Sequence, residues 1–197
     1  MRVELIHLCG TSPAVGNSDM VGRMRKADGF ALIDLLFVCG IMGVLMAVAL
    51  PRLLLAEQAA GSASAVGSMR TINSAELTYA LTCGNGFYAP TLKTLGTPPP
   101  GSNAPYISPD LGSNNSVAKG GYLIQLSGTP YGGAPATCNG LGVGEASQGF
   151  KAGADPTTPG NARFFATNAH SQIYENTSTL YASMPEVDDP LAGHPLR

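Results

Sequence analysis

The sequence predicts an α+β protein in which a long N-terminal α-helix packs on a small antiparallel β-sheet head. Two observations predict the helix: an apolar run from Phe30 to Leu50 that contains one charge, Asp34, and a helix-favouring stretch rich in Ala, Leu, Glu and Gln that continues to about Thr82. A third observation predicts the sheet, because the remaining chain is rich in Gly, Pro, Ser, Thr and Asn and holds short strand-like runs.

The apolar run is long enough to cross a bilayer. It covers 21 residues, and as a helix rising about 1.5 Å per residue it would span roughly 30 Å, the thickness of one hydrocarbon core. Arg23, Arg25 and Lys26 precede it, and such residues stay on the cytoplasmic side of a membrane. We therefore expect a single-pass segment with the head outside the cytoplasm.

Other interpretations of this segment are a plain anchor, a secretory signal peptide cleaved after Ala49, and a lipoprotein signal ending at Cys39. Residues 47–49 fit the small-x-small cleavage pattern, whereas bulky residues precede Cys39. Asp34 argues against the first two, because a carboxylate in an apolar helix costs a few kcal/mol on insertion scales and such groups have partners. The helical pattern also continues past Ala49, beyond a signal-peptide core.

Four residues and the apolar run fall in one register. Counted from Phe30, which follows Gly29, Asp34 is the fifth residue and Pro51 the twenty-second. This pattern resembles the processing signature of type IV pilins and type II secretion pseudopilins. The resemblance implies a pilin fold, cleavage after Gly29 by a prepilin peptidase, which is a membrane aspartyl protease, and methylation of the new amine of Phe30.

The resemblance extends into the head and covers residues 24–96. Residues 65–79, 86–90 and 92–96 are similar to the pattern "AVGSLRTINTAQ…Y…GYAPSLAALG" of a bacterial pilin subgroup. Two features depart from the family: its acid is nearly always Glu, and the leader here has 29 residues. A start at Met24 would give the usual six-residue leader, and residues 1–23 would then be upstream sequence.

The resemblance also implies roles and partners. Asp34 would pair with the N-terminal amine of a neighbouring subunit, and Pro51 would kink the helix. The expected partners are the peptidase, identical or homologous subunits in a helical filament, and an inner-membrane assembly platform with its ATPase. The protein would lie in a bacterial inner membrane before assembly and in a periplasmic or extracellular filament afterwards. A type IV pilus and a type II secretion pseudopilus both fit.

The expected organisation has four parts. They are a leader (1–29), a transmembrane and polymerisation half-helix (30–50), an amphipathic half-helix (51–82) and a head (83–197) with an irregular tail from Met184. In the second half-helix, a stripe that a sheet could cover consists of Ala59, Ala63, Val66, Met69, Ile72 and Ala80. A coiled-coil stalk would need sustained heptads, which the sequence lacks.

Three strands are predicted in the head. Residues 97–115 are expected to form a loop, residues 121–127 a first strand, and the following stretch to about Gly160 a long Gly-rich loop. Residues 162–167 and 171–175 are expected to form a hairpin that turns at residues 168–170.

The four cysteines fall into two pairs by location. Cys9 and Cys39 lie in the leader and the apolar run, whereas Cys83 and Cys138 lie in the polar remainder. In an exported protein, Cys83 and Cys138 could form a disulfide, and the alternative is two unpaired thiols. The sequence contains no C-x-x-C spacing, so neither a bound metal nor a covalently attached haem is predicted.

Little in the head suggests catalysis, so no enzyme and no cofactor are expected. His170 and His194 have no nucleophile motif nearby. Acidic residues cluster near the C-terminus, where major pseudopilins bind calcium, so Asp188 and Asp189 are calcium candidates. Their spacing does not match a strict calcium loop, and no metal is assigned.

Two function classes outside filaments remain open. One is a Sec-exported soluble binding protein cleaved after Ala49. The other is an anchored enzyme, although no catalytic motif in the sequence supports it. No basic stripe with interleaved aromatics occurs, so a nucleic acid partner is not predicted.

Overall fold

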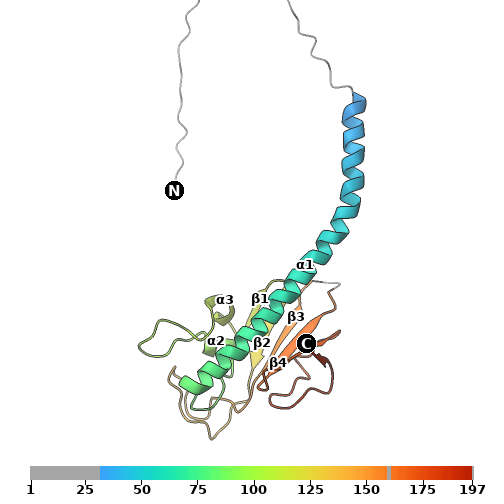
Figure 1. The fold of residues 1–197 in the computed structure, drawn as a ribbon. Helices are drawn as coiled ribbons and strands as arrows, with labels where there is room; N and C mark the ends of the chain where they lie inside the picture. The colour runs from blue at the N-terminus through green and yellow to red at the C-terminus, as the bar shows by residue number, and fades with distance from the viewer. Residues whose placement is uncertain (1–31, 159–160, 197) are drawn as a thin grey trace, which may run out of the picture. The chain divides into compact units, whose positions relative to one another are not determined.

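The structure is a computed structural model that describes residues 32–158 and 161–196. The chain divides into two units, Met1–Ala47 and Val48–Arg197, and each is described by itself. Helix α1 (Leu32–Thr82) contributes to both units. The first half of this helix is apolar and the second half packs on an antiparallel sheet, which confirms the predicted α+β class. The second unit also holds the short helices α2 (Leu92–Leu95) and α3 (Pro109–Gly112) (Figure 1).

Six strands form one antiparallel sheet in which each strand pairs with its chain neighbour, in the order β1-β2-β3-β4-β5-β6. The predicted hairpin is confirmed, because β4 and β5 pair with Thr167 opposite Ile173. The predicted first strand corresponds to β2. The strands are β1 (Ser116–Lys119), β2 (Tyr122–Ser127), β3 (Lys151–Pro156), β4 (Phe164–Asn168), β5 (Ile173–Asn176) and β6 (His194–Pro195).

The three-strand prediction was wrong, since three further strands complete the sheet. The stretch expected to be a Gly-rich loop contains β3, which lies between β2 and β4 in the middle of the sheet. Its sequence, Lys-Ala-Gly-Ala-Asp-Pro, lacks the β-branched and aromatic residues that mark strands. Short strands β1 and β6 were also missed, and the expected loop at residues 97–115 contains α3.

Small residues in β3 follow from packing on both faces of the sheet. Ala152, Gly153 and Ala154 are all buried. A Cβ atom on Gly153 would lie 2.6 Å from Cβ of Tyr181, so the ring of Tyr181 occupies the space that a larger residue would need. The small side chains of β3 therefore leave room for Tyr181 to pack against the middle of the sheet.

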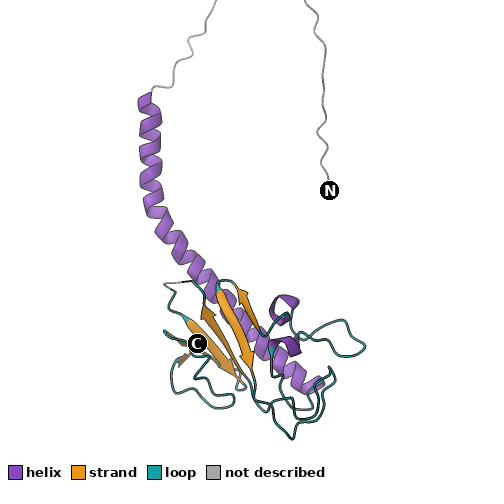
Figure 2. Cartoon of the chain, turned by 180° about the vertical axis from the view of Figure 1, so that it is seen from behind, coloured by secondary structure: helices purple, strands orange, loops and turns teal. Residues whose placement is uncertain are grey.

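The second half of α1 covers one face of the sheet (Figures 1 and 2). Met69, Ile72 and Tyr79 are fully buried there, in one core with Ile124 and Phe165 of the sheet. Burial of such side chains contributes about 1.5–3 kcal/mol each, so this interface stabilises the head.

The predicted stripe on α1 was partly right. Met69, Ile72 and Ala80 face the core as expected, whereas Ala59 and Ala63 are exposed. The covered face instead continues through Ala65 and Ser62, and these residues lie on the side of α1 that meets β2.

Buried polar contacts fix the position of α1 along the sheet. The hydroxyls of Ser62 and Tyr122 lie 2.9 Å apart. Asn73 donates to Oγ1 of Thr167 at 3.0 Å and to the carbonyl of Ser171 at 3.0 Å. A shift of α1 by one residue would leave these buried groups without partners, which costs about 1–3 kcal/mol for each.

The C-terminal segment packs on the opposite face of the sheet. Ala166 and Tyr174 form a second buried cluster there with Leu180 and Met184. The buried amide of Asn168 donates to the carbonyls of Pro185 and Asp188, at 3.1 and 2.6 Å. The tail expected to be irregular is thus hydrogen-bonded to the sheet, and its end contains β6.

Candidate functional site

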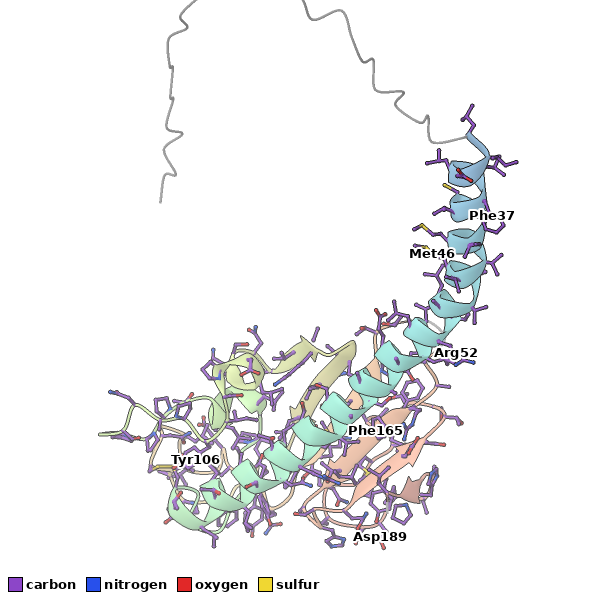
Figure 3. The ribbon with its side chains drawn as sticks, turned by 45° about the horizontal axis from the view of Figure 1, so that its top comes forward. Phe37, Met46, Arg52, Tyr106, Phe165 and Asp189 are labelled. Atoms are coloured by element: carbon purple, nitrogen blue, oxygen red, sulfur yellow. A yellow bond between two sulfur atoms is a disulfide. The ribbon has the colours of Figure 1, made fainter. Side chains whose placement is uncertain are left out.

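The first half of α1 is an exposed apolar surface. Every side chain from Leu32 to Glu57 is exposed, and Figure 3 shows Phe37 and Met46 projecting from the helix. Within the described residues, α1 is the helix that is long and apolar enough to cross a membrane by length and composition. Contiguous apolar surface of this size marks a segment that contacts lipid or another protein. The large exposed residues include Leu32, Ile33, Leu35, Leu36, Phe37, Ile41, Met42, Val44, Leu45 and Met46.

Asp34 is the charged residue between Leu32 and Pro51 on this surface. It lies in the first turn of α1, is exposed, and has no hydrogen-bond or ion-pair partner among the described residues. A carboxylate in a first turn gains about 0.3–1 kcal/mol from the helix dipole. Its cost in a bilayer is about 2.5–3.5 kcal/mol on insertion scales, so the dipole alone does not offset it. In an apolar environment a cationic partner would offset the remaining cost.

Gly40 and Gly43 leave the helix surface open beside larger side chains. A Cβ atom built on either glycine would meet nothing within 4 Å. An open groove on this surface is lined by Phe37, Gly40 and Ile41, together with Leu36, Val44 and Leu45. Small residues on an apolar helix allow a second helix to approach closely.

The structure describes the predicted assembly residues but not the predicted processing residues. Gly29 and Phe30 lie outside the described residues, as does the rest of the 1–29 leader, so cleavage and methylation stay predictions. Pro51 lies inside α1. Because proline has no backbone N–H, α1 lacks one of its hydrogen bonds at that turn.

The predicted disulfide is confirmed, and it closes the head at the end of α1. Cys83 and Cys138 are bonded, with Cα atoms 4.9 Å apart and a sequence separation of 55. Tyr106 lies beside the disulfide (Figure 3), with its hydroxyl 3.7 Å from Sγ of Cys138. Its ring packs edge-on against Tyr79 of α1. Among the described residues, Cys39 is a free and exposed thiol.

The acidic C-terminal residues make separate contacts. The carboxylate of Asp189 accepts a 2.6 Å hydrogen bond from Tyr174 and lies 3.7 Å from Nδ1 of His170. The bond from Tyr174 lowers the pKa of Asp189. Asp188 contributes its backbone carbonyl to Asn168, and Glu186 accepts from the backbone and side chain of Thr129. Within residues 32–158 and 161–196, no three His, Cys, Asp or Glu side chains gather as a metal site.

Sequence reasoning missed one buried carboxyl, Glu76. It is fully buried in α1, where Met69, Ile72 and Tyr79 define the core-facing side. Its spacing from these residues, at 69, 72, 76 and 79, was the available signal, because it places an acid on an apolar helix face.

Comparisons with known proteins give no match: no family model, no curated protein and no solved structure resembles this chain closely enough to be matched.

Proposed function

We propose that this protein is a structural subunit of a type IV pilus or a pilus-like filament. The observation that carries the proposal is the division of α1 into an exposed apolar half and a half packed on the sheet. The first half is suited to lipid before assembly and to other copies of the same helix afterwards. The second half packs on the sheet of the head, so polymerisation through the first half of α1 would place the heads along the filament.

The continuity of α1 supports this function over a discarded signal peptide. The helix runs without interruption through Ala49 and Leu50. Cleavage after Ala49 would leave Leu53, Leu54 and Leu55 exposed at the start of a soluble protein. In a filament, neighbouring helices cover the same residues.

Asp34 supplies the assembly chemistry in this proposal. Removal of the leader before Phe30 creates a positive amine four residues from Asp34 in sequence. In the filament, that amine of one subunit neutralises Asp34 of the next. Because a buried charge without a partner costs several kcal/mol, the pairing favours one axial position of each added subunit over the alternatives.

The N-terminus of the protein purified from native membranes tests this proposal. Intact mass and N-terminal sequencing should find a chain that begins with methylated Phe30. A chain that begins at Leu50 would overturn the proposal in favour of secretory cleavage. A chain that retains the leader would contradict prepilin processing and leave a plain anchor.

The filament type follows from a second measurement on the same cells. Surface filaments that contain the protein would identify a pilus. Processed protein confined to the periplasm, together with loss of exported enzymes when its gene is deleted, would identify a type II secretion pseudopilus.

A further inference from the structure

Glu76 is a carboxyl group enclosed in the core of the head. Its side chain is 0% exposed. Oε2 accepts a 2.9 Å hydrogen bond from the backbone N–H of Ala89. Oε1 is buried and has no hydrogen-bond partner among the described residues. Half of the carboxyl is therefore satisfied and half is not.

No positive charge compensates Glu76 in the part of the chain that the structure describes. The ion pairs there involve Asp110, Glu175 and Asp189, and none includes Glu76. Burial raises the pKa of Glu76 well above its ordinary value, and the N–H of Ala89 opposes this only in part.

Among the described residues, Tyr79 is the titratable side chain that interacts with the charge of Glu76. Tyr79 lies one turn further along α1, and Tyr106 packs against Tyr79 from the segment between α2 and α3. Burial and, to a smaller extent, the charge of Glu76 raise the pKa of Tyr79. A phenol is either neutral or negatively charged, so neither tyrosine can serve as the missing counter-ion.

Glu76 contacts the segment that follows α1 through the N–H of Ala89. We call this segment, residues 84–90, the post-helix segment. Asn85 and Gly86 turn the chain with φ values of 52° and 90°. Tyr88 then pairs with Ser147 through backbone hydrogen bonds of 2.8 and 3.0 Å. One side of the segment is thus bonded to the loop between β2 and β3, and the N–H of Ala89 points the other way, to Glu76.

We propose that Glu76 is a protonation-dependent latch between α1 and the post-helix segment. With the carboxyl neutral, the N–H of Ala89 docks on Oε2 and the segment is closed. With the carboxyl ionised, a buried charge without a counter-ion costs several kcal/mol. One hydrogen bond to a charged acceptor returns about 1.5–3 kcal/mol, so the segment opens and lets water reach the charge.

The sign of the pH dependence follows from the raised pKa. The unfolded carboxyl titrates near 4.5, and the folded one titrates higher. The stability that the neutral latch contributes is present below pH 4.5 and is lost progressively as the pH rises through the folded pKa. This inference concerns the head alone and does not depend on the filament proposal.

The first test compares variants of the full chain in detergent micelles, by urea unfolding between pH 4.5 and 9. Glu76→Gln keeps an oxygen for Ala89 and cannot ionise, and Glu57→Gln removes an exposed acid from the same helix as a matched control. Relative to Glu76→Gln, the wild type and the control should lose up to about tenfold in folding equilibrium constant per pH unit between pH 4.5 and the raised pKa of Glu76, and no more above it. Parallel pH profiles for all three proteins would overturn the latch.

A second test uses the wild type alone, in case Glu76→Gln does not fold. Hydrogen exchange is measured at pH 5 and pH 9 and corrected for the intrinsic pH dependence of exchange. Peptides from the post-helix segment should lose at least about tenfold more protection at pH 9 than peptides from β2. Equal loss in both, or no loss in either, would contradict a local latch.

Discussion

Two carboxyl groups on one helix, Asp34 and Glu76, stand in opposite surroundings. Asp34 is exposed on an apolar surface with no described partner, whereas Glu76 is enclosed with one N–H for its two oxygens. An acid in apolar surroundings either finds a positive partner or becomes neutral. We infer that Asp34 takes the first course, with a partner from another subunit, and that Glu76 takes the second.

Replacing Asp34 should separate processing from assembly. We expect Asp34→Ala to be cleaved normally, as intact mass would show, but to yield at least about tenfold fewer filaments, because the amine of the next subunit would be buried unpaired. Asp34→Glu is the matched control, since it keeps the charge with one more methylene, and it should retain most of the yield. Normal filament yield for Asp34→Ala would remove the assembly role of this residue.

At the scale of elements, two glycines of α1 show how differently its faces are used. A Cβ atom on Gly61 would lie 2.7 Å from the carbonyl oxygen of Gly120, in the turn between β1 and β2. A Cβ atom on Gly67 would meet nothing within 4 Å. The first glycine allows α1 to approach the sheet, whereas the second only weakens the helix.

Alanine at these two positions should change stability in opposite directions. We expect Gly67→Ala to stabilise the head by about 0.5–1 kcal/mol through helix propensity. Gly61→Ala should destabilise it by about 1–3 kcal/mol, because the methyl group would push α1 away from the turn. Urea unfolding of the full chain in detergent gives both values, and changes of the same sign would contradict the packing described here.

The elements that could be predicted from the sequence are those whose patterns are local. The apolar run and the Ala-rich stretch predicted α1, and short strand-like runs predicted β2 and the hairpin of β4 and β5. Strand β3 could not be predicted, because its small residues are required by Tyr181, 28 positions beyond Gly153 in the sequence. Its strand character comes from long-range packing.

The same distinction applies to the site residues. Cys83 and Cys138 were predicted as a pair because they are the cysteines of the polar region in a chain expected to be exported. Glu76 was missed because its partner is a backbone N–H, that of Ala89, which no side-chain pattern reveals. Asp34 was found because a single charge in an apolar run is visible in the sequence alone.

At the scale of the whole molecule, the disulfide ties the end of α1 to the loop between β2 and β3. The 55-residue separation encloses α2, α3, β1 and β2. A cross-link that closes a loop of this length lowers the conformational entropy of the unfolded chain. Through this effect the disulfide stabilises the head by no more than about 4 kcal/mol.

Loss of the disulfide should therefore be measurable in the head. We expect Cys83→Ser with Cys138→Ser, or reduction of the wild type, to lower the free energy of unfolding by about 2–4 kcal/mol. Cys39→Ser is the matched control, because Cys39 is exposed and free, and it should leave the urea midpoint unchanged. An unchanged midpoint after removal of Cys83 and Cys138 would show that packing alone closes the head.

The strand order of the sheet has a consequence for how the chain reaches its native state. Because every strand pairs with its neighbour in the chain, the sheet can grow one strand at a time in the order of the sequence. Cys138 precedes β3 in the chain, so in a chain that emerges from its N-terminal side both cysteines of the disulfide emerge before β3 to β6. A head that emerges with its N-terminal side first can thus be covalently closed around α1 before its last four strands arrive.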